Sequence, residues 1–236
     1  MENRSLRQPA AVGLAALLAL AVGTGGSLAQ EPALKAPEPG VPELFTLEGE
    51  FVRAAYNNEG YVTLGYRMAN RSVGEEWMLL EMGVTLRRGV DHQTLKRGAL
   101  SLETPDHRTL PLASQEEYRG VNLHALDLRM KTMPNDNISY FPPDARQACR
   151  IGYFADVGVT RAMSYDQVDL SSRRGCLGRI YFHVPAGIQH GQHWLNVQFE
   201  KSLVRVPFRI LTEEEEKKLS KSWKDIKKEH EKAFKQ

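Results

Sequence analysis

Residues 194–210 decide the fold, and they read WLNVQFEKSLVRVPFRI. Leu195, Val197 and Phe199 alternate with polar residues, and after the short turn 200–202 a second run alternates in the same way. Alternation over runs of this length is typical of strands that bury one face. Two such runs joined by a short turn predict an antiparallel hairpin.

The same pattern recurs along residues 44–211. The turn 57–60 predicts a further hairpin, and residues 114–133 carry apolar side chains at helical spacing, which predicts one or two short helices inserted between strands. The sequence therefore predicts a mainly β fold, an antiparallel β-sandwich with a short helical insertion. Its expected strands are residues 45–55, 60–69, 77–87, 100–103, 109–112, 151–155, 165–170, 177–184, 194–199 and 203–210.

The first 43 residues are expected to lie outside the sandwich. Arg4 and Arg7 precede an apolar stretch that ends in Ser27-Leu28-Ala29, the small-x-small pattern of a signal peptidase site. We expect residues 1–29 to be a signal peptide, cleaved after Ala29. Residues 30–43 hold four prolines, which favour an extended tether. The protein is thus predicted to be exported, either periplasmic or secreted.

Export changes how the two cysteines are interpreted. Cys149 and Cys176 are the only cysteines of the chain, and an even count in an oxidising compartment usually means a bridge. We expect a structural disulfide between them. A redox pair is disfavoured because the C-x-x-C spacing is missing.

Composition excludes some classes of protein. The chain has 236 residues with 42% hydrophobic residues, and 31 Lys and Arg balance 29 Asp and Glu, for a formal net charge of +2. That balance argues against a nucleic-acid binder that works by overall charge, and the apolar content is too high for a disordered chain. Any basic function must be local, and Arg173-Arg174 forms one such cluster, which is either a solvated turn or an anion site.

Catalytic and metal signatures are weak. The sequence holds no G-x-S-x-G elbow, no H-E-x-x-H motif and no Gly-rich phosphate loop, so we expect no enzyme and no cofactor. His190 and His193, with His183 seven residues before His190, could form one face of a zinc site if a hairpin brought them together. The more economical interpretation is one loop histidine and two strand histidines.

Aromatic residues supply the better hint of a ligand. Tyr181 and Phe182 should point to opposite faces of a strand, so that one of them lies outside, and Trp194 is out of phase with the apolar face of its strand. Exposed aromatic rings stack on sugars in carbohydrate-binding modules. Trp194 and Tyr181 are therefore candidate contact residues, and a glycan is a possible ligand.

Residues 212–236 predict a charged amphipathic helix at the end of the chain. Thr212 and Glu215 fit a capping box, and Glu213–Glu216 complement the positive end of the helix dipole. This helix either packs on its own sandwich or binds a partner protein, while membrane-surface binding is disfavoured because acids interleave the lysines. The narrow apolar stripe that would make the contact consists of Leu219, Trp223, Ile226 and Phe234.

Five short motifs lie along the expected strands: Ala69-Asn70, Leu100-x-Leu102, Thr104-Pro105-Asp106-His107-Arg108, Leu110-x-Leu112 and Gly178-Arg179-Ile180-Tyr181-Phe182-x-Val184-Pro185. Together they resemble exported bacterial immunoglobulin-like domains of the telokin-like type. The resemblance implies an immunoglobulin-like sandwich fold and a non-enzymatic role, and transfers no functional residue. His107 stands where such domains usually have a turn glycine, and the insertion 114–150 is long.

Three functions follow as hypotheses. The leading one is a non-catalytic exported module that binds a protein of the cell envelope or the extracellular space through the terminal helix and a sandwich face. The alternative is a carbohydrate or cell-wall binding module that uses Trp194. A metal-dependent enzyme that uses His183, His190 and His193 is the third.

Overall fold

The computed structural model describes residues 44–134, 136–159 and 162–233, and for 44–48 and 226–233 it describes the backbone alone. The predicted signal peptide (1–29) and tether (30–43) lie outside the described residues. Strands dominate the described chain, so the fold is mainly β. Its twelve strands are β1 (Leu44–Gly49), β2 (Val52–Tyr56), β3 (Gly60–Gly65), β4 (Trp77–Leu86), β5 (Gln93–Lys96), β6 (Leu100–Glu103), β7 (Thr109–Pro111), β8 (Gln147–Arg150), β9 (Gln167–Leu170), β10 (Arg174–His183), β11 (Gly191–Gln198) and β12 (Leu203–Ile210).

Four α-helices and one 3-10 turn complete the described elements: α1 (Arg67–Asn70), α2 (Gln115–Gly120), α3 (His124–Thr132), α4 (Glu213–Ala233) and η1 (Arg97–Ala99). The interruption predicted within 114–133 is confirmed as the two short helices α2 and α3. Ser114 caps α2, because its hydroxyl accepts from the Glu117 N–H at 3.1 Å while the Glu117 carboxylate accepts from the Ser114 N–H at 2.7 Å.

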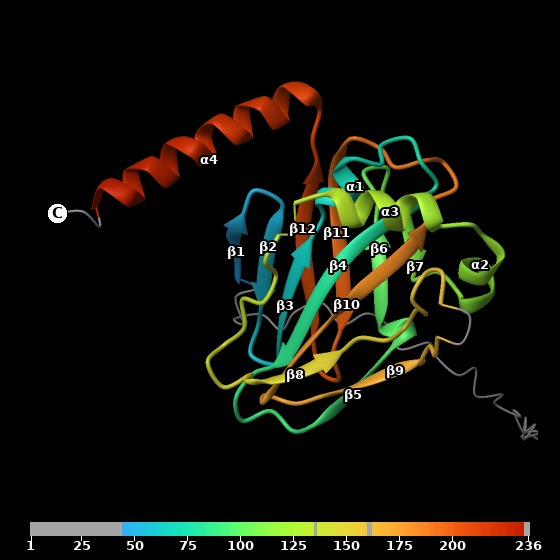
Figure 1. Cartoon of the computed structure of the whole chain (residues 1–236). Helices are drawn as coiled ribbons and strands as arrows, with labels where there is room; N and C mark the ends of the chain where they lie inside the picture. Colours follow the sequence, from blue (N-terminus) through green and yellow to red (C-terminus); the bar gives the residue numbers. More distant parts are fainter. Residues whose placement is uncertain (1–43, 135, 160–161, 234–236) are drawn as a thin grey trace, which may run out of the picture. The chain divides into compact units, whose positions relative to one another are not determined.

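The strands form three sheets (Figure 1). The largest has the order β1-β2-β3-β4-β10-β8, the second β12-β11-β6-β7, and β5 pairs with β9 in the third. β12 lies against β2 and β3, so the two larger sheets pack face to face. Both hairpins predicted from the sequence, β2–β3 and β11–β12, are present in antiparallel register.

The core follows the alternation of the sequence most closely in β12, which buries Val204, Val206, Phe208 and Ile210. β4 departs from it, because Leu79 of one face is buried as well as Met78 and Leu80 of the other. At the β2–β3 turn the packing is so close that a Cβ on Gly60 would come within 2.1 Å of the Phe199 ring. Only a glycine fits there, which ties the first hairpin to the last.

Four expectations about the strands are corrected. Residues 45–55 form parts of two strands, β1 and β2, and the end of the expected strand 60–69 belongs to α1. β8 pairs with β10 in parallel, whereas an all-antiparallel sandwich was expected. Residues 151–155 were expected to be a strand, yet they form an irregular segment in which Tyr153 and Phe154 are both buried. Its backbone meets β10 only at its start, where the Ile151 N–H donates to the Leu177 carbonyl at 2.8 Å. The four residues just before this segment form β8 instead.

Candidate binding surfaces

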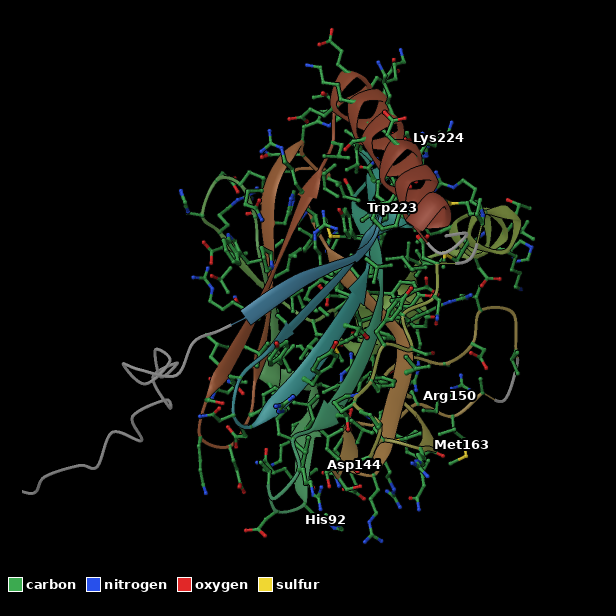
Figure 2. The ribbon with its side chains drawn as sticks, turned by 90° about the vertical axis from the view of Figure 1, so that its left-hand side faces the viewer. His92, Asp144, Arg150, Met163, Trp223 and Lys224 are labelled. Carbon is green, nitrogen blue, oxygen red and sulfur yellow. A yellow bond between two sulfur atoms is a disulfide. The ribbon has the colours of Figure 1, made fainter. Side chains whose placement is uncertain are left out.

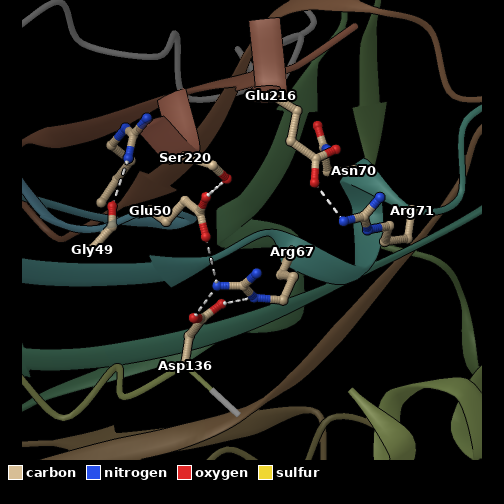
Figure 3. A network of polar contacts seen from close by, with 9 residues as sticks. Gly49, Glu50, Arg67, Asn70, Arg71, Asp136, Glu216 and Ser220 are labelled. Atoms are coloured by element: carbon tan, nitrogen blue, oxygen red, sulfur yellow. Dashed lines mark hydrogen bonds and ion pairs between the residues drawn. The ribbon is translucent and has the colours of Figure 1, made fainter. Parts of the chain in front are cut away.

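The first two turns of α4 are held by polar contacts to the end of α1 and to the β1–β2 turn (Figure 3). Glu216 pairs with Arg71 and accepts a hydrogen bond from the Asn70 side chain at 3.3 Å. Ser220, one turn further, donates to Glu50 in the β1–β2 turn. These contacts join the start of the helix to the β-sheet domain through charge and hydrogen bonding.

The sequence around the start of α4 explains why the helix begins there. The Thr212 hydroxyl accepts from the Glu215 N–H at 3.3 Å, and the Glu215 carboxylate accepts from the Thr212 N–H at 3.0 Å, so the predicted capping box is confirmed. Glu215 also pairs with Arg209 at 2.8 Å. The backbone hydrogen bond from Thr212 is the main reason why the pKa of Glu215 lies below its usual value.

Asn70 fixes the junction between β12 and α4. Its side-chain oxygen accepts from the Leu211 N–H at 2.6 Å, and its side-chain nitrogen donates to Glu216. The residue is buried at the end of α1, so one amide satisfies both the chain before the helix and the first turn of the helix.

Arg67 extends this network across the sheet. Its guanidinium binds Asp136 through two hydrogen bonds of 2.7 Å and approaches Glu50 at 3.4 Å. The hydrogen bonding to Asp136 is the main reason why the pKa of Arg67 is raised. A continuous chain of polar contacts therefore runs from Ser220 of α4 through Glu50 and Arg67 to Asp136 (Figure 3).

Asp136 lines a hollow of about 380 Å³ together with Glu81 and Arg179. Glu81 of β4 and Arg179 of β10 are register partners, and the Glu81 carboxylate lies over Gly65, within 3.5 Å of where a Cβ would stand. Burial raises the pKa of Glu81, Arg179 opposes this rise, and Asp136 adds to it. A carboxyl group with a raised pKa in a hollow is a feature typical of ligand sites.

The structure describes the side chains of two of the four residues of the predicted apolar stripe. Leu219 and Trp223 lie on α4 and are each partly buried, with Trp223 near Lys224 in Figure 2. Ile226 lies on the described backbone of α4, but its side chain is outside the description, and Phe234 lies outside the described residues. The two described members are thus neither fully exposed nor fully covered by their own domain.

Trp194 lies on the face of β11 that points away from the core. It is partly buried, and the Arg205 guanidinium lies 4.6 Å from its ring centroid. Arg205 is held there by Glu103 at 2.5 Å and by Asn196 at 3.2 Å. One face of the ring is therefore occupied, and a sugar would have to stack on what remains.

Tyr181 is not a surface residue, which corrects the expectation that it or Phe182 would lie outside. Both are buried, because the helical insertion and residues 151–155 cover the outer face of β10. The Tyr181 ring packs against Tyr118 and Phe154 at centroid distances of 5.0 Å each. This burial raises the pKa of the Tyr181 hydroxyl.

The three histidines are not brought together as a metal site. His183 ends β10, where it stacks on Trp77 at 5.2 Å, whereas His193 lies in β11 of the other sheet and His190 is exposed in the loop before β11. Within residues 44–134, 136–159 and 162–233, no group of three His, Cys, Asp or Glu side chains is placed to hold a metal ion. The hairpin that was expected to bring the three histidines together is not formed, because β10 and β11 belong to different sheets.

His193 is instead a core residue. Its Nδ1 donates to the Gly191 carbonyl at 3.1 Å and its ring stacks on Phe208 at 5.3 Å. Burial lowers the pKa of His193, so the neutral imidazole is favoured in the folded protein.

The predicted disulfide is confirmed between Cys149 of β8 and Cys176 of β10. The two residues are direct register partners in the parallel pair. The bridge therefore joins the edge strand of the large sheet to its neighbour.

The sequence pattern did not single out the residues that build the polar network, namely Glu50, Arg67 and Asp136. It also did not single out Glu81, or Glu59, whose buried carboxylate accepts from the Ser202 hydroxyl. Nothing near these residues in the sequence marks them, since each finds its partners through strand pairing or loop packing. A charged residue in a strand otherwise filled by apolar side chains is the one signal that could have pointed to Glu81.

A scan of protein-family models, a search of curated proteins and a search of solved structures each find no match to this chain. Among the helices that the structure describes, none is long and apolar enough to cross a membrane.

Proposed function

We propose that the chain is a non-catalytic, exported immunoglobulin-like module that binds a protein of the cell envelope or the extracellular space through α4 and the sandwich face beside it. The proposal rests on one observation above all. α4 has 21 residues, and among its described side chains, residues 213–225, the polar contacts to Asn70, Arg71, Arg209 and Glu50 come from the first two turns.

The described side chains of α4, residues 213–225, gain little apolar burial from their own domain. Most helical stability in proteins comes from burying an apolar face rather than from intrinsic propensity. Leu219 and Trp223 are only partly buried. A partner that covers these two side chains would supply the missing burial, as in helix-in-groove recognition.

Two further observations support the immunoglobulin-like and exported parts of the proposal. His107 adopts φ 62°, a conformation that favours glycine, at the turn where telokin-like domains usually have glycine. The Cys149–Cys176 bridge is of the kind that persists in oxidising compartments.

A capture experiment tests this function. The immobilised chain is exposed to envelope extract beside a Leu219→Ser/Trp223→Ser variant, which alters the apolar stripe. The matched control is Lys218→Ser/Asp225→Ser, which changes two exposed residues on another face of α4 and leaves the net charge the same. The expected result is a protein captured by the chain and by the control but lost from the stripe variant.

Two outcomes contradict the proposal. Equal capture by the stripe variant would place the contact elsewhere on the sandwich. Retention of glycan alone, lost in Trp194→Ala, would identify a carbohydrate-binding module instead.

A further inference from the structure

A hollow of about 660 Å³ lies at the opposite end of the sandwich from α4, close to His92 (Figure 2). The start of β5, β8, the end of β9 and the turn before β10 form its walls. The turn is Ser171-Ser172-Arg173-Arg174, and both arginines line the hollow. This site is separate from the α4 surface and does not depend on the function proposed for it.

The two guanidinium groups are the distinctive feature of the hollow. Both arginines are exposed, and among the described residues neither guanidinium has a carboxylate within ion-pair distance or a hydrogen-bond acceptor. Most described arginines differ in this respect, as Arg67, Arg129 and Arg150 do with their acidic partners. Two adjacent cations without a counter-ion repel each other, and an anion between them removes that cost.

The other polar groups of the hollow leave this positive charge in excess. Asp169 is the acid that lines it, and the Thr94 hydroxyl donates to its Oδ1 at 3.1 Å. The Ser172 hydroxyl, the Gln147 amide and His92 add donors along the wall. Because two arginines and one acid line the hollow, its net charge is positive. Positive charge together with hydroxyl and amide donors is the chemistry that recognises an oxyanion.

The backbone that carries the arginines is fixed before any ligand arrives. The Arg174 N–H donates to the Ser171 carbonyl at 3.2 Å, and the Gln147 N–H donates to the Arg173 carbonyl at 2.9 Å. Gly175 lies under the Phe141 ring, which a Cβ would approach to 2.6 Å, and Cys176 is bridged to β8. A turn held in this way loses little conformational freedom on binding.

We propose that the Ser171–Arg174 turn binds a compact oxyanion, a phosphate or sulfate group, between the guanidinium groups of Arg173 and Arg174. The group is either free or the end of a larger molecule. The hollow is large enough for such a group together with part of the molecule that carries it.

The test follows the side-chain Nε–H signals of the arginines by NMR in the full chain, with inorganic phosphate and inorganic sulfate as separate probes. Both signals should shift saturably, and Arg173→Gln/Arg174→Gln should weaken binding by about tenfold or more, because two charge-assisted contacts are lost. The matched control is Arg88→Gln, since Arg88 is exposed and lies outside the hollow. It should bind as the unaltered chain does.

A second arm identifies the source of the group. Vesicles of phosphatidylcholine with and without phosphatidylglycerol are sedimented with the chain and with the double variant. Co-sedimentation that requires phosphatidylglycerol and both arginines would assign the phosphate to a lipid headgroup, whereas saturable binding of the free ions alone would assign it to a small molecule. Shifts that do not saturate, or an Arg88→Gln variant weakened as much as the double variant, would overturn the proposal.

Discussion

Glu59 is a buried carboxylate whose acceptor positions are occupied by the β11–β12 turn. Its oxygens accept from the Ser202 hydroxyl at 2.6 Å, from the Gln93 amide at 2.6 Å and from the Lys201 N–H at 3.1 Å. The side chain therefore joins the β2–β3 turn to the β11–β12 turn and to β5. Its hydrogen bonding indicates a structural residue, because few acceptor positions remain for a ligand.

We expect Glu59→Ala to lower the free energy of unfolding by roughly 3 kcal/mol, because three donors lose their acceptor in a buried place. Urea unfolding followed by circular dichroism measures the change. Glu116→Ala, an exposed acid on α2, is the control and should change stability by less than about 0.5 kcal/mol. Equal effects of the two variants would contradict the structural role of Glu59.

Removing the charge of Glu81 should have the opposite effect on stability from removing Glu59. Its pKa in the folded protein is raised above the ordinary value of 4.5 by burial, so the folded state binds the proton more tightly than the unfolded state does. Stability then falls as the pH rises through this window, and the loss is complete above the raised pKa. Glu81→Gln should therefore be more stable than the unaltered protein at pH 7, and this advantage should disappear below the ordinary value.

Thermal unfolding from acid to neutral pH measures this difference, with Glu116→Gln as an exposed control. A Glu81→Gln variant that is less stable at pH 7 would mean that attraction to Arg179 outweighs burial. A destabilising carboxyl group in a hollow is of interest for function, since such a group commonly serves a ligand rather than the fold.

Asn70 joins α4 to α1 and to the end of β12. It binds both the Leu211 N–H and Glu216, so we expect Asn70→Ala to loosen the start of the helix while the sheets stay folded. Hydrogen exchange should accelerate in residues 213–220, by a factor equivalent to about 1 kcal/mol for the lost hydrogen bonds.

Asn58→Ala is a suitable comparison because Asn58 is exposed in the β2–β3 turn, away from α4. It should leave exchange in α4 unchanged. Unchanged exchange in Asn70→Ala as well would show that α4 is held by other contacts.

The elements also show what the sequence can and cannot predict. The hairpins β2–β3 and β11–β12 could be predicted, because alternation and a short turn are local signals. β8 could not, because Gln147–Arg150 has no alternating pattern and pairs through a parallel connection. The network around Arg67 could not be predicted either, because long-range packing brings Asp136 to Arg67 and Ser220 to Glu50.

At the scale of the whole molecule, the disulfide is the strongest single constraint. It joins residues 27 positions apart and closes the far edge of the large sheet. We expect Cys149→Ala/Cys176→Ala to lower the free energy of unfolding by about 2–5 kcal/mol. Thermal unfolding of this variant, and of the unaltered protein with and without reductant, measures the effect.

Agreement between the reduced protein and the double variant would assign the loss to the bridge itself. An unchanged melting temperature in both would contradict the prediction. The variant also bears on the oxyanion site, since the turn that carries Arg173 and Arg174 lies next to the bridge.

The pairing of β4 with β10 joins strands that lie far apart in the sequence, since Val84 is the register partner of Cys176. Until β10 is in place, β4 presents an open, apolar sheet edge. Contacts of such long range slow folding and prolong the exposure of aggregation-prone strands. A chain truncated within the helical insertion keeps this edge unpaired, and we therefore expect it to aggregate more readily than the full chain.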